Sequence, residues 1–290
     1  MAETVRPKAG PQRERILALT ERERETFART HRRSRDLYER SGGSLLGGVP
    51  MSWMMKWAGG FPVFAEDAEG STVFDVDGNE YADFCLGDTG AMTGHAPPAV
   101  AATAAEQAAR AITTMMPSPD APVVGEALAE RFGLPLWQVT LSATDANRFA
   151  IRMARQITGR PRILIFNWCY HGTVDETFAV LREGRVVSRP GNVGPPVDLE
   201  RTTRVVEFND VSALEEALAH EDVACVLAEP AMTNIGIVLP EPGLHDALRE
   251  LTRRRGTILI IDETHTISAG YGGFTREHGL DPDVLTVGKT

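Results

Sequence analysis

From residue 137 onward, short apolar runs alternate with amphipathic segments, and this alternation limits the possible folds more than any other feature. The runs have the length and the β-branched content of buried strands, whereas the segments between them have helical spacing. This alternation is typical of a mostly parallel sheet with helices on its faces. The expected strands cover residues 138–141, 162–166, 205–208, 223–228, 257–261 and 284–287, and the expected helices cover 146–157, 213–220 and 244–254.

The N-terminal part of the chain has a different pattern. Residues 11–41 combine helically spaced apolar residues with Arg and Glu, which is typical of a solvated helix face or of an arm that packs on a partner subunit. Residues 61–84 predict a β meander in which Asp77 and Gly78 form a hairpin turn. Two further helices are expected over residues 97–112 and 122–132.

The segment 41–60 is rich in glycine and yet carries a large apolar load. It contains Trp53, Met54, Met55 and Trp57 between glycine pairs, with Pro50 to interrupt any helix. Such residues either line a binding pocket or form a small satellite core, and their spacing favours neither interpretation.

Composition excludes several classes of function. A net charge of −10 disfavours binding to nucleic acid or to an anionic membrane, both of which need a basic surface. The three cysteines are far apart and form no CxxC pair, so the sequence suggests neither a disulfide framework nor a structural zinc site. No apolar run approaches the roughly 20 residues of a membrane span. We therefore expect a cytoplasmic protein without a metal.

Ionisable residues follow the last two expected strands. Asp262 and Glu263 come directly after the run 257–261, and Lys289 follows the run 284–287. In an open α/β sheet, ligands bind outside the carboxyl ends of the strands. A carboxylate and a lysine at that edge can therefore serve one ligand.

Three other expected strands also end in polar residues. Ser142, Ala143 and Thr144 open a helix, where they either hold an anion or simply cap the helix. Tyr170 either stacks on a flat ligand or packs as an ordinary aromatic residue, and Cys169 with His171 lacks the further ligands of a metal site. Glu229 follows the run 223–228 as a loop ion-pair partner or as support for a site.

Together these segments resemble the class III aminotransferases of the fold-type I enzymes that use pyridoxal 5'-phosphate, in the branch of glutamate-1-semialdehyde aminomutase. The resemblance covers about residues 47–290 and rests on the motifs SATDAN, CYHG, AEP followed by TN, IIDETHT with YGGF, and PDVLTVGK, in the family's order. It implies an aspartate aminotransferase-like α/β fold whose sheet is mostly parallel and flanked by helices. Residues 1–60 would form a helical arm and pocket-lining segment, 61–112 part of a small domain and a connection, and 113–290 the large cofactor-binding domain.

The resemblance also implies roles for individual residues. Lys289 would form a Schiff base with pyridoxal phosphate, and Asp262 would bind the pyridine nitrogen. The cradle of Ser142, Ala143 and Thr144 would hold the phosphate, and Tyr170 would stack on the ring. The remaining cofactor-contacting positions implied by the motifs are His171, Glu229, Asn234, Thr264 and His265. The expected reaction moves an amino group between a small amino donor and a keto acid, within a homodimer.

Some positions depart from the family pattern. Ala143 replaces a glycine, Thr264 a branched apolar residue, and His265 a Gln or Met found in many relatives. The segment GGVPMSWMMKW lacks the arginine that holds the substrate carboxylate in the aminomutase, and Trp53 and Met54 stand near its position. We therefore expect Trp53 and Met54 to contact an apolar substrate, with the aminomutase reaction as the second alternative.

Rival interpretations are weaker. A DExH-type ATPase needs a glycine where Asp283 stands and needs the phosphate loop before the acidic motif, and no GxGxxG follows a strand as a dinucleotide site requires. A catalytically inactive remnant of the transaminase fold is the main competitor. In the resembled family the sequence continues past the lysine into a C-terminal domain, so we expect the 290 residues to be a truncated form that lacks this domain.

Overall fold

The computed structural model describes residues 13–193 and 197–289, and its chain divides into two compact units. The first unit consists of Met1–Leu86 and Thr93–Ile112, and the second of Gly87–Met92 and Thr113–Thr290. The turn at residues 87–92 therefore belongs to the second unit, although the chain on both sides of it belongs to the first. The expected division at residues 60 and 112 stays a prediction.

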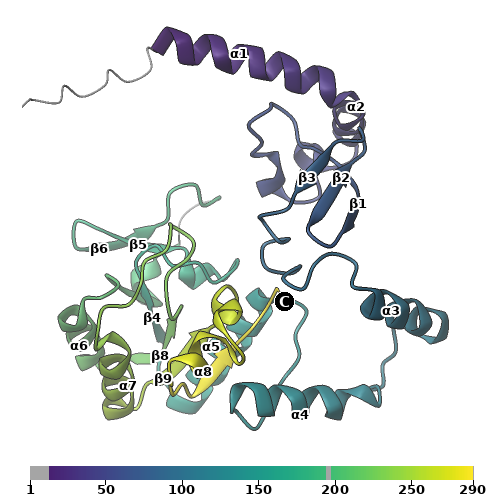
Figure 1. Cartoon of the computed structure of the whole chain (residues 1–290). Helices are drawn as coiled ribbons and strands as arrows, with labels where there is room; N and C mark the ends of the chain where they lie inside the picture. Colours follow the sequence, from purple (N-terminus) through teal and green to yellow (C-terminus); the bar gives the residue numbers. More distant parts are fainter. Residues whose placement is uncertain (1–12, 194–196, 290) are drawn as a thin grey trace, which may run out of the picture. The chain divides into compact units, whose positions relative to one another are not determined.

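The first unit contains a three-stranded antiparallel meander with helices before and after it (Figure 1). The predicted hairpin turn is present, since Gly78 has a φ of 84° and its N–H donates to the Asp75 carbonyl. The elements are α1 (Arg13–Thr30), α2 (Arg32–Ser41), two 3-10 turns (Leu46–Gly48 and Ser52–Met55), β1 (Ala65–Glu69), β2 (Thr72–Asp75), β3 (Glu80–Ala82) and α3 (Pro98–Arg110).

The helical spacing of residues 11–41 corresponds to two helices, α1 and α2, in the described part of this segment. The helix breaks at His31, whose φ of −126° and ψ of 49° are not helical. The carboxylate of Asp77 accepts the N–H groups of Arg33 and Ser34 at 2.7 and 2.9 Å, and so starts a second helix from the hairpin turn. Pro11 and Gln12 lie outside the described residues.

The second unit is built on a five-stranded sheet in the order β10-β9-β8-β4-β7, with every pair parallel. The predicted class of fold, a parallel sheet with flanking helices, is confirmed. Helix α5 packs against β8, β9 and β10, while α6 and α7 pack on each other and against β7 and β9 (Figure 1). The elements are α4 (Asp120–Phe132), α5 (Ala143–Thr158), β4 (Arg162–Phe166), β5 (Ala179–Arg182), β6 (Arg185–Ser188), β7 (Thr203–Val206), α6 (Val211–Ala219), β8 (Val223–Ala228), α7 (Leu244–Arg255), β9 (Ile258–Asp262), α8 (Gly273–Glu277) and β10 (Val284–Thr286), with short 3-10 turns at Asp175–Thr177, Leu199–Arg201 and Thr266–Ala269.

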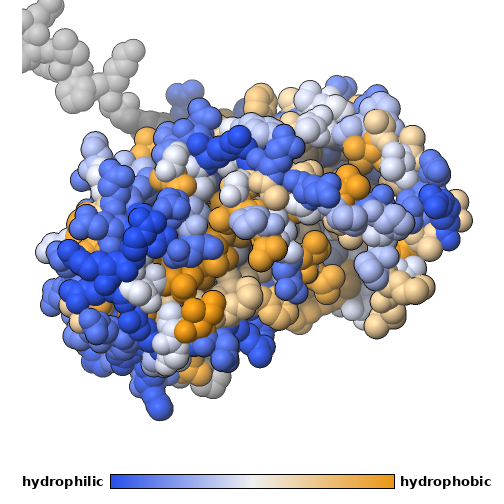
Figure 2. All heavy atoms as spheres, turned by 90° about the horizontal axis from the view of Figure 1, so that it is seen from below, coloured by the Kyte–Doolittle hydropathy of each residue, from blue (hydrophilic) through white to orange (hydrophobic). Residues whose placement is uncertain are grey.

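The strand expected at residues 138–141 is absent, which corrects that prediction. A strand needs a neighbour that shares its backbone hydrogen bonds, and within the described residues this segment pairs with none. Val139 and Leu141 are accordingly 82% and 100% exposed. Apolar side chains of this kind are visible at the surface between hydrophilic ones (Figure 2).

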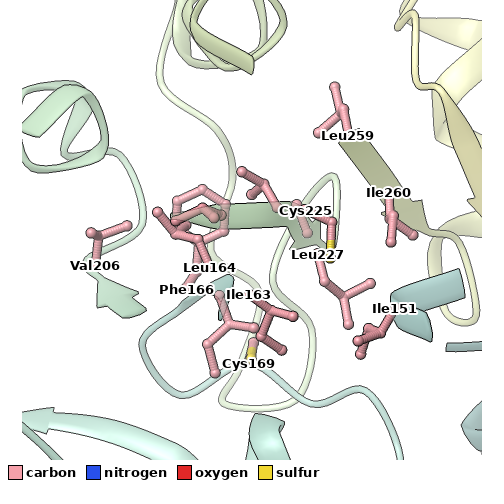
Figure 3. Packing of buried hydrophobic residues seen from close by; sticks show 14 of the residues in the cluster. Ile151, Ile163, Leu164, Phe166, Cys169, Val206, Cys225, Leu227, Leu259 and Ile260 are labelled. Atoms are coloured by element: carbon pink, nitrogen blue, oxygen red, sulfur yellow. The ribbon is translucent and has the colours of Figure 1, made fainter. Parts of the chain in front are cut away.

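The core of the second unit lies between its central strands and the helices that pack on them. All six residues of β8 are buried, as expected for the middle strand of a sheet covered on both faces. Ile151 from α5, Ile163 and Phe166 from β4 and Leu227 from β8 meet in this core (Figure 3). This packing fixes the strand ends on which the candidate site is built.

Neither a membrane span nor a metal cluster is found in the described ranges. None of the helices in residues 13–193 and 197–289 combines the length and apolar character needed to cross a bilayer. Over the same ranges, no three His, Cys, Asp or Glu side chains are grouped to hold a metal ion.

Candidate active site

The site is centred on Asp262, the last residue of β9, which is only 3% exposed. Its carboxylate accepts hydrogen bonds on both oxygens. One oxygen receives the Asn147 side-chain amide at 2.8 Å and contacts His171 Nδ1 at 2.8 Å. The other receives the Thr264 N–H at 3.0 Å and its hydroxyl at 2.6 Å. Three neighbouring elements therefore hold this carboxylate in one orientation.

Asn147 lies on the buried face of α5 and joins two strands. It follows the same helical spacing as the buried residues Ile151 and Ala154, so it points toward the sheet. Its amide nitrogen donates to Asp262, and its oxygen accepts the hydroxyl of Thr286 from β10 at 2.7 Å. Thr286 pairs with Asp262 in the parallel register of β10 and β9.

The pKa values of His171 and Asp262 move in opposite directions. Burial by itself raises the pKa of Asp262, but the hydrogen bond and charge of His171, with the bonds from Thr264 and Asn147, bring it below its ordinary value. Burial by itself lowers the pKa of His171, yet Cys169 and Asp262 raise it well above the ordinary value. The two side chains therefore form a buried ion pair, and His171 Nε2 has no hydrogen-bond partner among the described residues.

The N-terminus of α5 offers free hydrogen-bond donors beside this pair. Ser142 caps the helix by accepting the Asp145 N–H at 3.1 Å, whereas no hydrogen bond within the described residues engages the N–H of Ala143 or Thr144. A Cβ at Gly172 would lie 2.1 Å from the Thr144 hydroxyl oxygen, and one at Gly288 would lie 2.6 Å from the Ala143 Cβ. Glycine thus lets two loops close around the first turn of α5.

Glu229 organises the loop that follows β8. It is 5% exposed and its carboxylate accepts the N–H of Tyr170 at 3.2 Å. It also accepts the N–H and the hydroxyl of Thr233 at 3.1 and 3.0 Å. Glu229 therefore fixes the backbone at Tyr170, whose side chain stays 39% exposed.

Lys289 follows β10 and lies in contact with His265, which follows β9. The Lys289 Nζ is 2.6 Å from His265 Nε2 and also donates a hydrogen bond to the Asp88 carboxylate. Asp88 belongs to the turn at residues 87–92 of the same unit. The lysine amine thus reaches the same edge of the sheet as Asp262.

The structure places most of the residues predicted for the site in small hydrogen-bonded groups that follow the ends of the strands and open α5. Asn234 is different, because it is exposed and its side chain makes no hydrogen bond among the described residues. Trp53, which is 63% exposed, and Met54 belong to the first unit, so their assignment to the substrate stays a prediction. The predicted residues in these groups, or next to them at the start of α5, are Ser142, Ala143, Thr144, Tyr170, His171, Glu229, Asp262, Thr264, His265 and Lys289.

Sequence reasoning missed other residues of these groups, among them Asn147, Thr233 and Asp88. Asn147 carried a signal, since a polar residue at an apolar position of an amphipathic helix is expected to have a buried partner. Thr233 carried a weaker one as part of a polar run after a buried strand. Asp88 carried none, because its contact with Lys289 joins residues that are 201 positions apart.

Comparisons with known proteins give a consistent result. The profile of the family described as Aminotransferase class-III matches residues 53–290. A curated relative, glutamate-1-semialdehyde 2,1-aminomutase of Syntrophus aciditrophicus, is 37% identical over 264 residues. That alignment covers 88% of this chain and 61% of the relative, so the chain spans about three fifths of the length of the relative it matches.

Solved structures agree with this result. Two structures of a glutamate-1-semialdehyde-aminomutase from Pseudomonas aeruginosa PAO1, one of them in complex with PMP, are 51% and 50% identical with a TM-score of 0.93. Each match covers 97% of this chain and 62% of the other. An omega-transaminase from Sphaerobacter thermophilus is 33% identical with a TM-score of 0.81, over 88% of this chain and 60% of that one.

Proposed function

Because the chain belongs to the class-III aminotransferase family, we propose that it moves an amino group between an amine or amino acid and a keto acid, with Lys289 as the residue that carries the cofactor. The cofactor of this family is pyridoxal 5'-phosphate. The observation that carries the proposal is the buried Asp262 carboxylate at the end of β9, beside the strand that leads to Lys289.

The residues present fit this cofactor. The free N–H groups of Ala143 and Thr144 and the Ser142 hydroxyl would hold the phosphate, with support from the positive end of the α5 dipole. Asp262, whose lowered pKa keeps it anionic, would hold the protonated pyridine nitrogen. Tyr170 is sufficiently exposed to stack on a ring. Thr264 and His171 would keep Asp262 in place.

Each residue then has a defined chemical task. When bound, the cofactor supplies an electron sink for the substrate carbon that bears the amine. The Lys289 amine is the nucleophile and carries a proton at Nζ to and from that carbon. Asp262 maintains the charge on the ring nitrogen, and its fixed hydrogen bonds mean that it does not need to reorganise during the reaction.

The closest alternative is the internal amino transfer of glutamate-1-semialdehyde 2,1-aminomutase. The identity to the Pseudomonas and Syntrophus proteins of that name favours it. Against it, the segment 47–57 contains no arginine for the substrate carboxylate, and its only cation is Lys56. We therefore place exchange between two substrates first and the aminomutase second. A third possibility is a catalytically inactive form of the same fold.

We also propose that the protein acts as a homodimer on small-molecule substrates. Val123 and Val124 of α4 are 63% and 48% exposed, and Leu136 is 89% exposed in the segment that follows. Apolar side chains exposed in this way are suited to contact with a partner subunit.

A donor screen tests the proposed reaction. The 290-residue chain is loaded with pyridoxal phosphate, and each donor is added while the cofactor absorbance is followed. We expect apolar amines or amino acids to convert the cofactor to its aminated form, and a keto acid to restore it. Turnover of glutamate-1-semialdehyde alone would support the aminomutase, and no response to any donor would support the inactive form.

A further inference from the structure

The Lys289 amine has two ionisable neighbours rather than one. It lies 2.6 Å from His265 Nε2 and in hydrogen-bond contact with Asp88. His265 Nε2 and an Asp88 oxygen are themselves 3.7 Å apart. The three side chains come from the end of β10, the end of β9 and the turn at residues 87–92, so separate parts of the chain converge on one amine.

Hydrogen bonds behind His265 determine which of its nitrogens carries the proton. The Glu229 carboxylate can only accept, so the hydroxyl of Thr233 donates to it at 3.0 Å. The Thr233 oxygen is then free to accept from His265 Nδ1, which lies 2.5 Å away. Neutral imidazole with its proton on Nδ1 has a lone pair on Nε2. That lone pair faces the Lys289 amine.

We propose that His265 is the base that takes the proton from the Lys289 ammonium group, and that Thr233 and Glu229 are positioning residues that fix its tautomer. The step breaks an N–H bond at Lys289 Nζ and forms one at His265 Nε2. It leaves a neutral amine with its electron pair and an imidazolium, and it consumes no other reactant. This assignment rests on the proposed function, in which Lys289 is the reacting amine.

The Asp88 carboxylate lies close to both Lys289 Nζ and His265 Nε2. Its negative charge therefore balances the positive charge of the transferred proton on either nitrogen. The proton moves from Lys289 to His265 before the amine attacks, because an ammonium group has no free electron pair. The charged or titratable groups that face this pair are Asp88 directly and Glu229 through Thr233.

Competitive acetylation tests the contact without any cofactor. The chain has three lysines, Lys8, Lys56 and Lys289, so peptide mapping can compare Lys289 with the exposed Lys56 in the same sample. The His265 lone pair takes the proton that an ammonium group must lose before it reacts, whereas the amide of His265→Gln accepts a hydrogen bond but no proton. At one fixed pH, the ratio of Lys289 to Lys56 labelling should therefore be about tenfold higher in the wild type than in His265→Gln. Equal ratios in the two proteins would overturn the proposal.

The rate of covalent attachment of pyridoxal phosphate, trapped with borohydride, tests the role as a base. General bases contribute typically 10²–10⁴-fold, so His265→Gln should slow attachment at Lys289 by about a hundredfold. The slow attachment in His265→Ala should become faster when imidazole is added. Attachment should be slow in Thr233→Val, which lacks the hydroxyl, and as fast as in the wild type in Thr233→Ser, which keeps it. A merely structural role of Thr233 would not require this difference. If attachment in His265→Ala is slow and added imidazole does not restore its rate, the role of His265 as a base is contradicted. If pyridoxal phosphate attaches to no lysine at all while the acetylation ratios are as predicted, the proposed function has failed instead.

Discussion

The side-chain amide of Asn147 donates a 2.8 Å hydrogen bond to the carboxylate of Asp262, 115 residues further along the chain. The same side chain accepts the hydroxyl of Thr286 at 2.7 Å. A single buried amide thus connects helix α5 with strands β9 and β10, the two strands that lead to the candidate site. It also accounts for part of the lowered pKa of Asp262.

Substitution of Asn147 by alanine should destabilise the second unit. The change leaves Thr286 without its acceptor and Asp262 without one donor, and an unsatisfied buried polar group costs roughly 1–3 kcal/mol. We therefore expect the free energy of unfolding in urea to fall by roughly 2–6 kcal/mol, from two such groups. Asn192→Ala is the matched control, because that asparagine is exposed and makes one long side-chain bond. Equal effects from the two substitutions would contradict this account.

The ion pair of His171 and Asp262 predicts how stability depends on pH. Asp262 has a lowered pKa in the folded state, so its contribution is present above the unfolded carboxyl pKa of about 3.9 and is lost as the pH falls through the folded value. His171 has a raised pKa, so its contribution is complete below the unfolded imidazole pKa of about 6.5 and is lost as the pH rises through the folded value.

The pair should therefore stabilise the fold most between about pH 4 and pH 6.5. Breaking a buried pair costs roughly 3–5 kcal/mol, so Asp262→Asn should lose about that much in this window and less on either side. Urea unfolding of both proteins from pH 3 to pH 9 measures the difference. A difference that does not change with pH would show that the pair is not charged.

Gly172 should tolerate no side chain, because it lies against the first turn of α5. It has a φ of 77°, and a Cβ there would lie 2.1 Å from the Thr144 hydroxyl oxygen. We expect Gly172→Ala to displace that turn and to weaken binding of pyridoxal phosphate at least tenfold, in a titration followed by absorbance.

Gly184 provides the matched control for this substitution. Its φ of 75° is nearly the same, but nothing lies within 4 Å of its Cβ position. Gly184→Ala should therefore show only the backbone penalty of roughly 1–2 kcal/mol for a left-handed residue, with cofactor affinity unchanged. If both variants lose affinity for pyridoxal phosphate equally, crowding at Thr144 does not explain the effect.

The local sequence pattern predicted most of the buried strands. Where prediction and structure differ, contacts between residues distant in sequence explain the difference. β4 and β8 have the predicted bounds, because each is a short apolar run that the sheet buries. The run at residues 138–141 also contains β-branched residues, but within the described residues it has no neighbouring strand to pair with. The break at His31 depends on a cap from Asp77, which no local pattern reveals.

The candidate site shows the same limit. Asp262 and Lys289 could be placed at one sheet edge from the ends of their strands alone. The departure noted at His265 gave no indication of what the histidine contacts, because Thr233 and Asp88 approach it from other loops. The antiparallel hairpin of β5 and β6 was also not predicted, although it is a short and regular element.

Borohydride reduction of the chain loaded with pyridoxal phosphate, followed by peptide mapping, tests the central claim most directly. With only Lys8, Lys56 and Lys289 present, the position of the label is unambiguous. We predict one label, at Lys289, and none in Lys289→Ala. A label at Lys8 or Lys56, or no label on any of the three, would contradict the assignment of Lys289 as the residue that carries the cofactor.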